Sequence, residues 1–169
     1  MPAALKPCAI DTNVLIDLEA GRVLLALFGL PLYLMTTDFV IDELQEPDGQ
    51  QLQRYGLVSC ELSPDGILEL ARLKSQYPRT SIADLSVLVL ARATKALLLT
   101  GEKNLRAIAE REGMTVHGTL WLLDEMVSRH VIIPPVAFQA LRRMLQRGSR
   151  LPRDKCEQRL ARWGARGQS

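Results

Sequence analysis

The chain has 169 residues, of which 47% are hydrophobic and 24% charged, and its formal net charge is +2. This length suits one globular domain, and the composition excludes a disordered or low-complexity protein. The three cysteines are odd in number and lack CxxC spacing, which argues against a disulfide framework or a zinc site. No apolar run approaches the ~20 residues of a membrane span, and the amino end has no secretory signal pattern. We therefore expect a cytoplasmic protein with no membrane partner.

The sequence predicts strands that alternate with helices. Strands are predicted as apolar runs at 7–10, 32–36, 57–62, 96–100 and 114–118. The first helices are predicted from a cap at Thr12 or Asn13 through Leu18, over Arg22 to Phe28, and from a cap at Thr36 or Thr37 through Leu44, with Glu43 close to the start of the last of these and a turn at 47–49 after it. Further helices are predicted over 65–76, opened by Ser63, and over 81–95, capped by Ser81. The last two are predicted over 101–113 with its entering loop, and over Thr119 to His130. This alternation predicts a parallel sheet, whose sites gather outside the carboxyl ends of the strands.

Beyond Ile133 the pattern changes to helices only, at 136–149 and 153–164. We therefore expect a domain of residues 1–133 and a basic helical extension of residues 134–169 that packs on the domain or trails from it. From Gln139 to Ser169 there are nine Arg or Lys against two acidic residues, and the part before it holds twelve against seventeen. An acidic body with a basic tail suits a protein that gathers divalent cations in one place and holds a polyanion in another.

Four acidic residues lie at the edges of predicted elements: Asp11 in IDTNVLIDL, Glu43 in FVIDEL, Asp84 in SIADLS and Glu102 in LLLTGEKNLR. Carboxylates are costly near an apolar core, so their convergence at element ends favours a shared divalent metal. Each acid also has a simpler explanation. Asp84 is favourable in the first turn of a helix without a metal, and Asp42 could act in place of Glu43. For Asp11 the simpler explanation is weakest, because we do not expect that position to cap a helix.

The other candidate residues have structural interpretations. Asp17, Asp38, Asp42 and Asp124 are interpreted as solvated or capping residues, and His117 and His130 as structural. Trp121 fits the apolar face of its helix, so we expect it in the core. Trp163 lies among arginines, which favours contact with a base or a partner.

These segments together resemble the PIN-domain ribonucleases, and within that family the small bacterial proteins of the VapC toxin type. IDTNVLIDL, TTDFVIDEL, SIADLSVLVLA and LLLTGEKNLR are similar to the four acidic motifs of the family, and GTLWLL is similar to the glycine-threonine element that follows them. The resemblance covers about Ala9 to His130. It implies a three-layer α/β/α fold with a central, mostly parallel sheet, and an endoribonuclease that leaves a 5′-phosphate and a 3′-hydroxyl. Homodimerisation is implied as well.

In this interpretation Asp11, Glu43, Asp84 and Glu102 are the catalytic residues and hold one or two Mg²⁺ or Mn²⁺ ions. Such hard cations prefer carboxylate oxygens, and two of them ~4 Å apart activate a water for attack on phosphorus. Polar side chains beside the acids are expected to orient them: Thr12, Asn13, Thr100 and Asn104. Glu102 stands where the family commonly has aspartate, and Asn104 where many relatives have a second acid.

The basic extension has three uses that the sequence leaves open. Its cationic side chains could bind RNA phosphates, pair with an acidic segment of an antitoxin protein, or serve only to keep the tail hydrated. The candidates are Arg142, Arg143, Arg147, Arg150, Arg153 and Lys155.

Two other functions are weighed against the ribonuclease. The first is a catalytically degenerate PIN-like module that binds nucleic acid or protein. The second, a dinucleotide-binding enzyme, is disfavoured because DTN follows the first strand in place of a glycine-rich turn.

Overall fold

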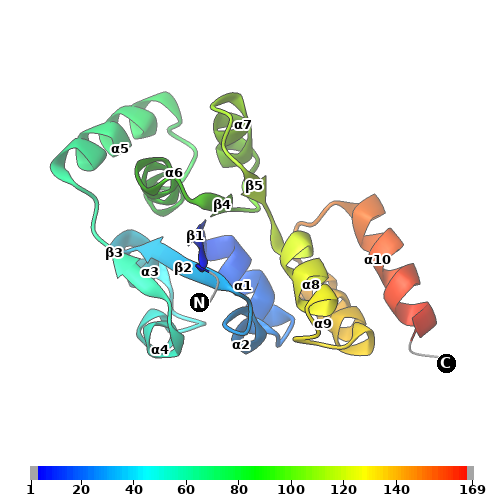
Figure 1. Cartoon of the computed structure of the whole chain (residues 1–169). Helices are drawn as coiled ribbons and strands as arrows, with labels where there is room; N and C mark the ends of the chain where they lie inside the picture. The colour runs from blue at the N-terminus through cyan, green and yellow to red at the C-terminus, as the bar shows by residue number, and fades with distance from the viewer. Residues whose placement is uncertain (1–3, 167–169) are drawn as a thin grey trace.

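The computed structural model describes residues 4–166, which fold around one five-stranded sheet (Figure 1). All strand pairs are parallel, and the strands lie in the order β3-β2-β1-β4-β5. The strands are β1 (Lys6–Ile10), β2 (Leu32–Thr37), β3 (Val58–Cys60), β4 (Leu97–Leu99) and β5 (Val116–His117). The parallel sheet expected from the alternating pattern is confirmed.

The two central strands, β1 and β4, are continuous apolar runs. Cys8 pairs with Leu34 of β2 on one side and with Leu97 of β4 on the other. The last three residues of β1 and all three of β4 are buried. Strands buried on both faces have this composition because helices cover the sheet from both sides.

Helices form a layer on each face of the sheet. Ten helices lie within the described chain: α1 (Thr12–Ala20), α2 (Leu24–Leu27), α3 (Asp38–Glu43), α4 (Gly49–Tyr55), α5 (Pro64–Gln76), α6 (Ile82–Thr94), α7 (Lys103–Arg111), α8 (Thr119–Ser128), α9 (Pro134–Gln146) and α10 (Arg153–Arg166). Figure 1 shows α5, α6 and α7 on one side of the sheet and α1, α2, α8 and α9 on the other. The α/β/α architecture expected from the sequence is confirmed.

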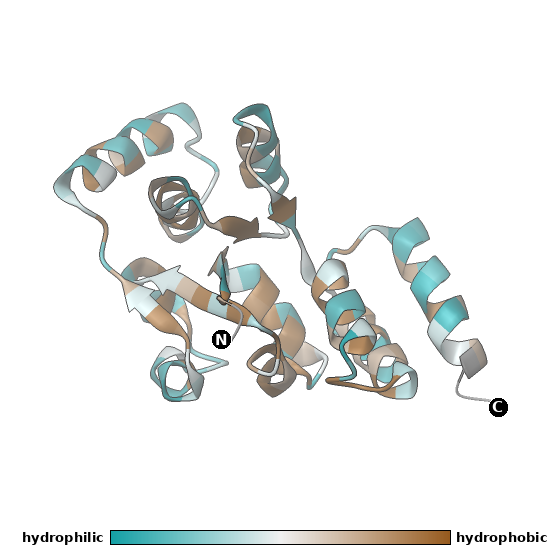
Figure 2. Cartoon of the chain, in the orientation of Figure 1, coloured by the Kyte–Doolittle hydropathy of each residue, from teal (hydrophilic) through white to brown (hydrophobic). Residues whose placement is uncertain are grey.

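The buried helix α6 and the exposed helix α5 show why the layers form. Nine consecutive residues of α6, Ala83–Ala91, are buried, and α6 packs on β1, β2 and β4. Helix α5 packs outside α6, and polar and apolar residues alternate along it (Figure 2). The caps predicted for both helices are confirmed, because the Ser63 and Ser81 hydroxyls accept from the backbone N–H groups of Gly66 and Asp84.

Helix α4 was missed by the sequence analysis, which expected only a turn at 47–49. Asp48 caps this helix by accepting from the backbone N–H of Gln50 at 2.9 Å. Of its side chains other than glycine, only Leu52 is buried. A helix with one buried apolar side chain has no detectable apolar period, so sequence patterns do not predict it.

Helices α9 and α10 pack against the rest of the chain. Ala137, Ala140, Leu141 and Met144 of α9 are fully buried in the common core. Gly21, at the end of α1, allows close approach, because a Cβ atom there would lie 2.6 Å from the Met144 Cε. Helix α9 therefore packs directly on α1, and α10 packs along α9.

Two expectations about residues that meet at α10 were wrong. Trp163 was expected to be open to a partner, but it is only 1% exposed. Asp124 was expected to be solvated or capping, but it accepts from the Arg159 guanidinium at 2.6 Å and from Arg162 at 3.0 Å. The burial of Trp163 and these ion pairs join α10 to the body of the protein.

None of the helices between residues 4 and 166 is long and apolar enough to cross a membrane. The cysteines at positions 8, 60 and 156 are all free thiols.

Candidate active site

The loops that follow β1 and β4 meet where the order of the sheet reverses. From β1 the chain continues to the layer of α1, and from β4 it continues through α7 in the opposite layer, so the two loops diverge and leave a crevice between them. The backbone N–H of Asp11 donates to Leu99 of β4 at 3.0 Å. The Thr100 hydroxyl donates to the Asp11 carboxylate at 2.5 Å and accepts from the Glu102 backbone N–H at 3.0 Å. Asp11, Thr100 and Glu102 therefore form one hydrogen-bonded group.

Asp11 is the cap of α1, which corrects the expectation that Thr12 or Asn13 would cap this helix. Its Oδ1 accepts from the Val14 backbone N–H at 2.9 Å, and the side chain is fully buried. The backbone of Asp11 is still extended after β1 ends at Ile10, which is the conformation that a cap residue needs. Asp11 therefore has a structural role in addition to any chemical one.

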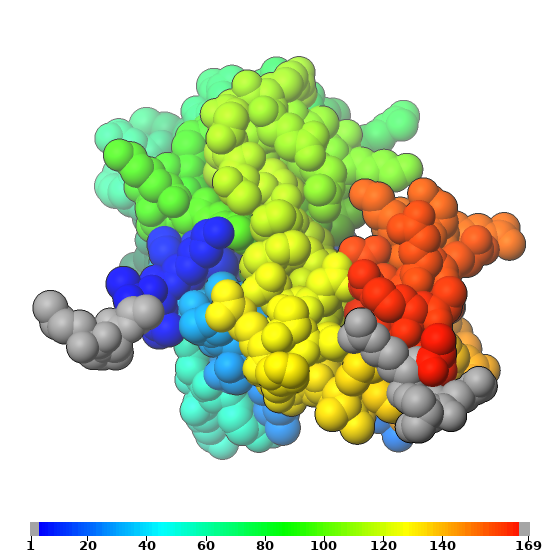
Figure 3. All heavy atoms as spheres, turned by 45° about the vertical axis from the view of Figure 1, so that its right-hand side comes forward, coloured from blue at the N-terminus to red at the C-terminus, as the bar shows by residue number. Residues whose placement is uncertain are grey.

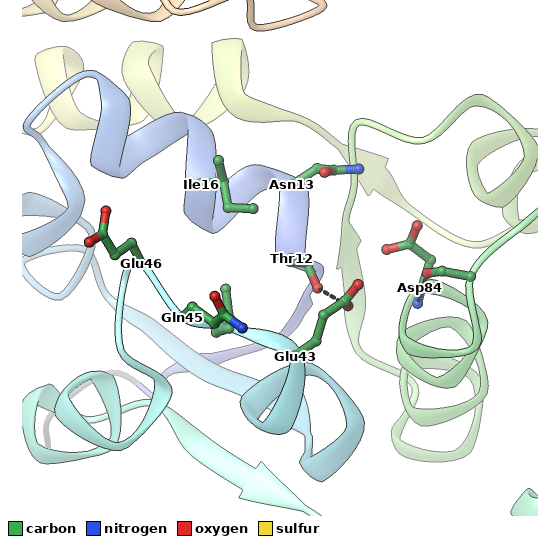
Figure 4. A pocket seen from close by; sticks show the side chains of 9 residues that line it. Thr12, Asn13, Ile16, Glu43, Gln45, Glu46 and Asp84 are labelled. Atoms are coloured by element: carbon green, nitrogen blue, oxygen red, sulfur yellow. Dashed lines mark hydrogen bonds between the residues drawn. The ribbon is translucent and has the colours of Figure 1, made fainter.

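Glu43 reaches the site from the end of α3, whereas the sequence analysis placed it near the start of this helix. The Thr37 hydroxyl caps α3 at Val40 and lies 2.6 Å from the Ser86 hydroxyl of α6. These contacts fix α3 on α6, and α3 ends after one and a half turns at Glu43. The Glu43 carboxylate then accepts from the Thr12 hydroxyl at 3.1 Å (Figure 4).

Asp84 lies in the first turn of α6 and points into a cleft opposite Glu43 (Figure 4). It is 8% exposed, and its carboxylate lies near the Ser81 hydroxyl that caps the helix. The cleft has a volume of about 400 Å³ and is lined by Thr12, Asn13, Ile16, Glu43, Leu44, Gln45, Glu46, Ser81 and Asp84. Glu43 lines it and its neighbour Asp42 does not.

Gln45 and Glu46 are lining residues that the sequence analysis missed. They follow Glu43 and Leu44 at the cleft wall. Their signal in the sequence was the polar run after the FVIDEL motif, which we interpreted only as the approach to a turn. Ser81 was predicted as a cap but not as part of the cleft.

Burial and mutual repulsion raise the pKa values of two acids. Burial raises the pKa of Asp11 from 3.8 to about 7, against the opposing hydrogen bonds from Thr100 and Val14, and the Asp84 charge adds to the rise. Burial also raises the pKa of Asp84, the Ser81 hydrogen bond opposes it, and the charges of Glu43 and Glu102 add to it. The Asp84 carboxylate therefore lies close enough to Asp11, Glu43 and Glu102 for the charges to repel.

The carboxylate oxygens of the four acids are the ligands that a hard divalent cation prefers, but the side chains are not arranged as a complete coordination shell. Within residues 4–166 no three His, Cys, Asp or Glu side chains are close enough to hold a metal ion. The Glu102 carboxylate caps α7 by accepting from the Leu105 N–H at 2.8 Å, and Thr12 holds Glu43. Glu43 is exposed and Glu102 half-buried, so both can rotate towards Asp11 and Asp84.

The four residues expected to orient the acids are placed differently from one another. Thr12 and Thr100 donate directly to Glu43 and Asp11. Asn13 is exposed and lines the cleft. The Asn104 amide instead donates to the Thr80 hydroxyl at 3.2 Å, between the start of α7 and the turn before α6.

The six candidate cations of the extension lie on α9, α10 and the turn between them. All are exposed except Arg143, which is half-buried. The Arg142 guanidinium lies 5.7 Å from the centre of the Phe138 ring, and Arg153 pairs with Glu157 at 3.1 Å. None of the six lines the acidic cleft. We call these six residues together the basic surface.

A family model, DUF3368, described as a PIN domain, matches residues 8–165. The matched segment contains the four acidic candidates Asp11, Glu43, Asp84 and Glu102, together with α9 and almost all of α10. No curated protein matches the chain.

Proposed function

This chain belongs to the PIN-domain family, and on that premise we propose that it is a metal-dependent endoribonuclease that hydrolyses phosphodiester bonds of RNA. PIN domains are generally nucleases that use divalent metal ions. The observation that carries the proposal is the convergence of Asp11, Glu43, Asp84 and Glu102 at one end of the sheet, with raised pKa values at the two aspartates. It costs free energy to bury carboxylates of like charge close together, and sites that bind a cation typically have this arrangement.

In the proposed mechanism the two aspartates are the fixed ligands and the two glutamates complete the site. One or two Mg²⁺ or Mn²⁺ ions would supply a water activated for in-line attack and charge to stabilise the leaving oxygen. Asp11 is immobilised by its cap and by Thr100, and Asp84 by the first turn of α6. Burial lowers the local dielectric, which strengthens the interaction of these carboxylates with any cation.

Removal of divalent metal is the direct test of this function. Cleavage of a labelled single-stranded RNA in Mg²⁺ is expected to stop in EDTA and to return when excess Mn²⁺ is added. The products are expected to carry 5′-phosphates and 3′-hydroxyls, because water attacks the phosphorus and the 3′-oxygen leaves. Cleavage that persists in EDTA, or products with 2′,3′-cyclic phosphates, would show a different chemistry.

A second candidate, the non-catalytic binding module, is favoured by one specific observation. Glu102 already serves as the cap of α7, and Asn104 donates to Thr80, so neither is committed to a metal. A titration with Mn²⁺, in which calorimetry measures the heat of binding, separates the two candidate functions. Heat from binding together with cleavage supports the nuclease, whereas RNA binding without Mn²⁺ binding or cleavage supports the module.

The basic surface supports RNA as the substrate. We expect Arg147→Gln combined with Arg150→Gln to weaken RNA binding and to reduce the slope of log affinity against log salt by about 0.7 for each phosphate that the variant no longer neutralises. Arg72→Gln is the matched control, because Arg72 lies on α5 and already pairs with Glu69. Fluorescence anisotropy at several salt concentrations measures the slope. An unchanged slope in the double variant would exclude these two cations from phosphate binding.

The proposal extends to protein partners. A toxin of a type II toxin–antitoxin pair would bind an acidic antitoxin segment, and the basic surface offers the complementary charge. A homodimer would bury apolar surface, and Leu68 of α5, 70% exposed, with the adjacent Ile67 offers such surface. Light scattering after size-exclusion chromatography tests the homodimer.

A further inference from the structure

Two aromatic rings outside the acidic cleft are stacked at the edge of the sheet. The rings of His117, on β5, and Trp121, on α8, are 4.2 Å apart between centroids and only 5° from parallel. Trp121 packs on the core and both side chains are half-buried. Because β5 is an edge strand, no further strand of the described chain covers His117 on its outer side. The segment that joins α7 to α8, which contains β5, lies on the face turned towards the viewer in Figure 3, as does α10.

A short chain of contacts connects this aromatic pair to the acids. The backbone carbonyl of His117 accepts from the Thr100 N–H at 2.9 Å, and the Thr100 hydroxyl donates to Asp11. His117 is therefore one residue removed from the proposed ligand Asp11.

A cation lies between the two sites. The Arg106 guanidinium donates to the Thr100 carbonyl at 3.4 Å, and a Cβ atom on Gly118, next to His117, would lie 3.3 Å from its Nη2. Its side chain is 40% exposed, and its ion pair with Glu110 is long, at 3.8 Å. Arg106 thus keeps donors free for a phosphate on the path from the acids to the rings.

We propose that the His117–Trp121 pair is a stacking platform for an unpaired nucleobase, and that Arg106 contacts the phosphate between that base and the cleaved bond. The inference rests on the proposed function in that the ligand is single-stranded RNA. Stacking on a flat ring tolerates any base, because every base has a π-face.

The surroundings of His117 favour this use of the ring. Burial, with Lys6 and Arg106 nearby, lowers the pKa of His117, while Glu125 opposes the shift. The ring is therefore neutral at pH 7 and presents a flat aromatic surface. The other tryptophan, Trp163, is a residue of α10 that is buried against the body of the protein, so it is not available to a base.

The test is a scan with abasic nucleotides. Single-stranded RNA oligonucleotides of one sequence, each with one abasic position, are titrated with protein in Ca²⁺, and binding is followed by fluorescence anisotropy. In the wild type we expect one position at which loss of the base weakens binding about tenfold. In His117→Ala the same position should make no difference, and in His117→Phe, which keeps a flat ring, the penalty should remain.

Tyr33→Ala is the control, because Tyr33 is an exposed aromatic at the amino end of β2 and should keep the wild-type penalty. The platform is excluded if His117→Ala shows the same penalty as the wild type at that position, or if the wild type binds no RNA. Cleavage in Mg²⁺, assayed in parallel, separates the two proposals. Cleavage without a His117-dependent penalty overturns the platform alone, and a His117-dependent penalty without cleavage overturns the nuclease alone.

Discussion

Asp84→Asn is expected to lower the rate of RNA cleavage by about a thousandfold, the scale on which removal of one preorganised charge acts. Asparagine has the same shape but removes the charge that faces Glu43 and Glu102. The helix should survive the change, because the Ser81 hydroxyl that caps it accepts from the backbone N–H of residue 84, which the substitution keeps. Initial rates in saturating Mg²⁺ measure the effect, and the melting temperature reports the fold.

Asp42→Asn is the matched control for this experiment. Asp42 is an exposed acid next to Glu43 but does not line the cleft, so its variant should cleave at the wild-type rate. An Asp84→Asn protein that stays folded and cleaves as fast as Asp42→Asn would remove Asp84 from the mechanism. The reverse result, loss of cleavage in Asp42→Asn only, would mean that Asp42 and not its neighbour Glu43 is the functional acid.

Asp11→Asn is expected to stabilise the metal-free protein at high pH while abolishing cleavage. The folded-state pKa of Asp11 is raised from 3.8 to about 7, so the folded protein holds this proton more tightly than the unfolded chain does. The resulting stability is fully present below about pH 4 and is lost as the pH rises through about 7. At 1.36 kcal/mol for each pH unit, the ionised carboxylate costs up to about 4 kcal/mol above pH 7.

Asparagine avoids that cost and keeps the cap. Its side-chain oxygen can accept from the Val14 N–H as the carboxylate does. We therefore expect the free energy of unfolding of Asp11→Asn to exceed that of the wild type at pH 8 in EDTA and to approach it at pH 4. Urea denaturation at both pH values measures the difference. Equal differences at pH 4 and pH 8 would show that the carboxylate of Asp11 is not perturbed.

Much of the fold follows from local patterns in the sequence. The buried strands at positions 8–10 and 97–99 are continuous apolar runs, and Ser63 and Ser81 are capping residues at the expected places. Trp163 was also predictable in principle. Cys156, Leu160 and Trp163 recur at helical spacing and are at least partly buried on one face of α10, and the surrounding arginines obscured this period.

The remaining features depend on contacts between segments far apart in the sequence. The start of α3 is fixed by Thr37, whose hydroxyl meets that of Ser86, 49 residues later, and neither glycine nor proline stands at the end of the helix at Glu43. Asp124 pairs with Arg159 across 35 residues. The stacking of His117 on Trp121 joins residues only four apart, but it depends on how the chain turns from β5 into α8, so the sequence indicated only two structural residues.

A divalent cation held between the acids of the cleft is the basis of the proposed activity, and a crystal structure soaked in Mn²⁺ tests its presence most directly. Anomalous scattering is expected to give one or two peaks in the cleft, about 2.1 Å from carboxylate oxygens of Asp11 and Asp84, with Glu43 or Glu102 rotated towards them. At a Mn²⁺ concentration that supports cleavage, a cleft without an anomalous peak, or a peak bound only elsewhere on the protein, would contradict this placement of the metal.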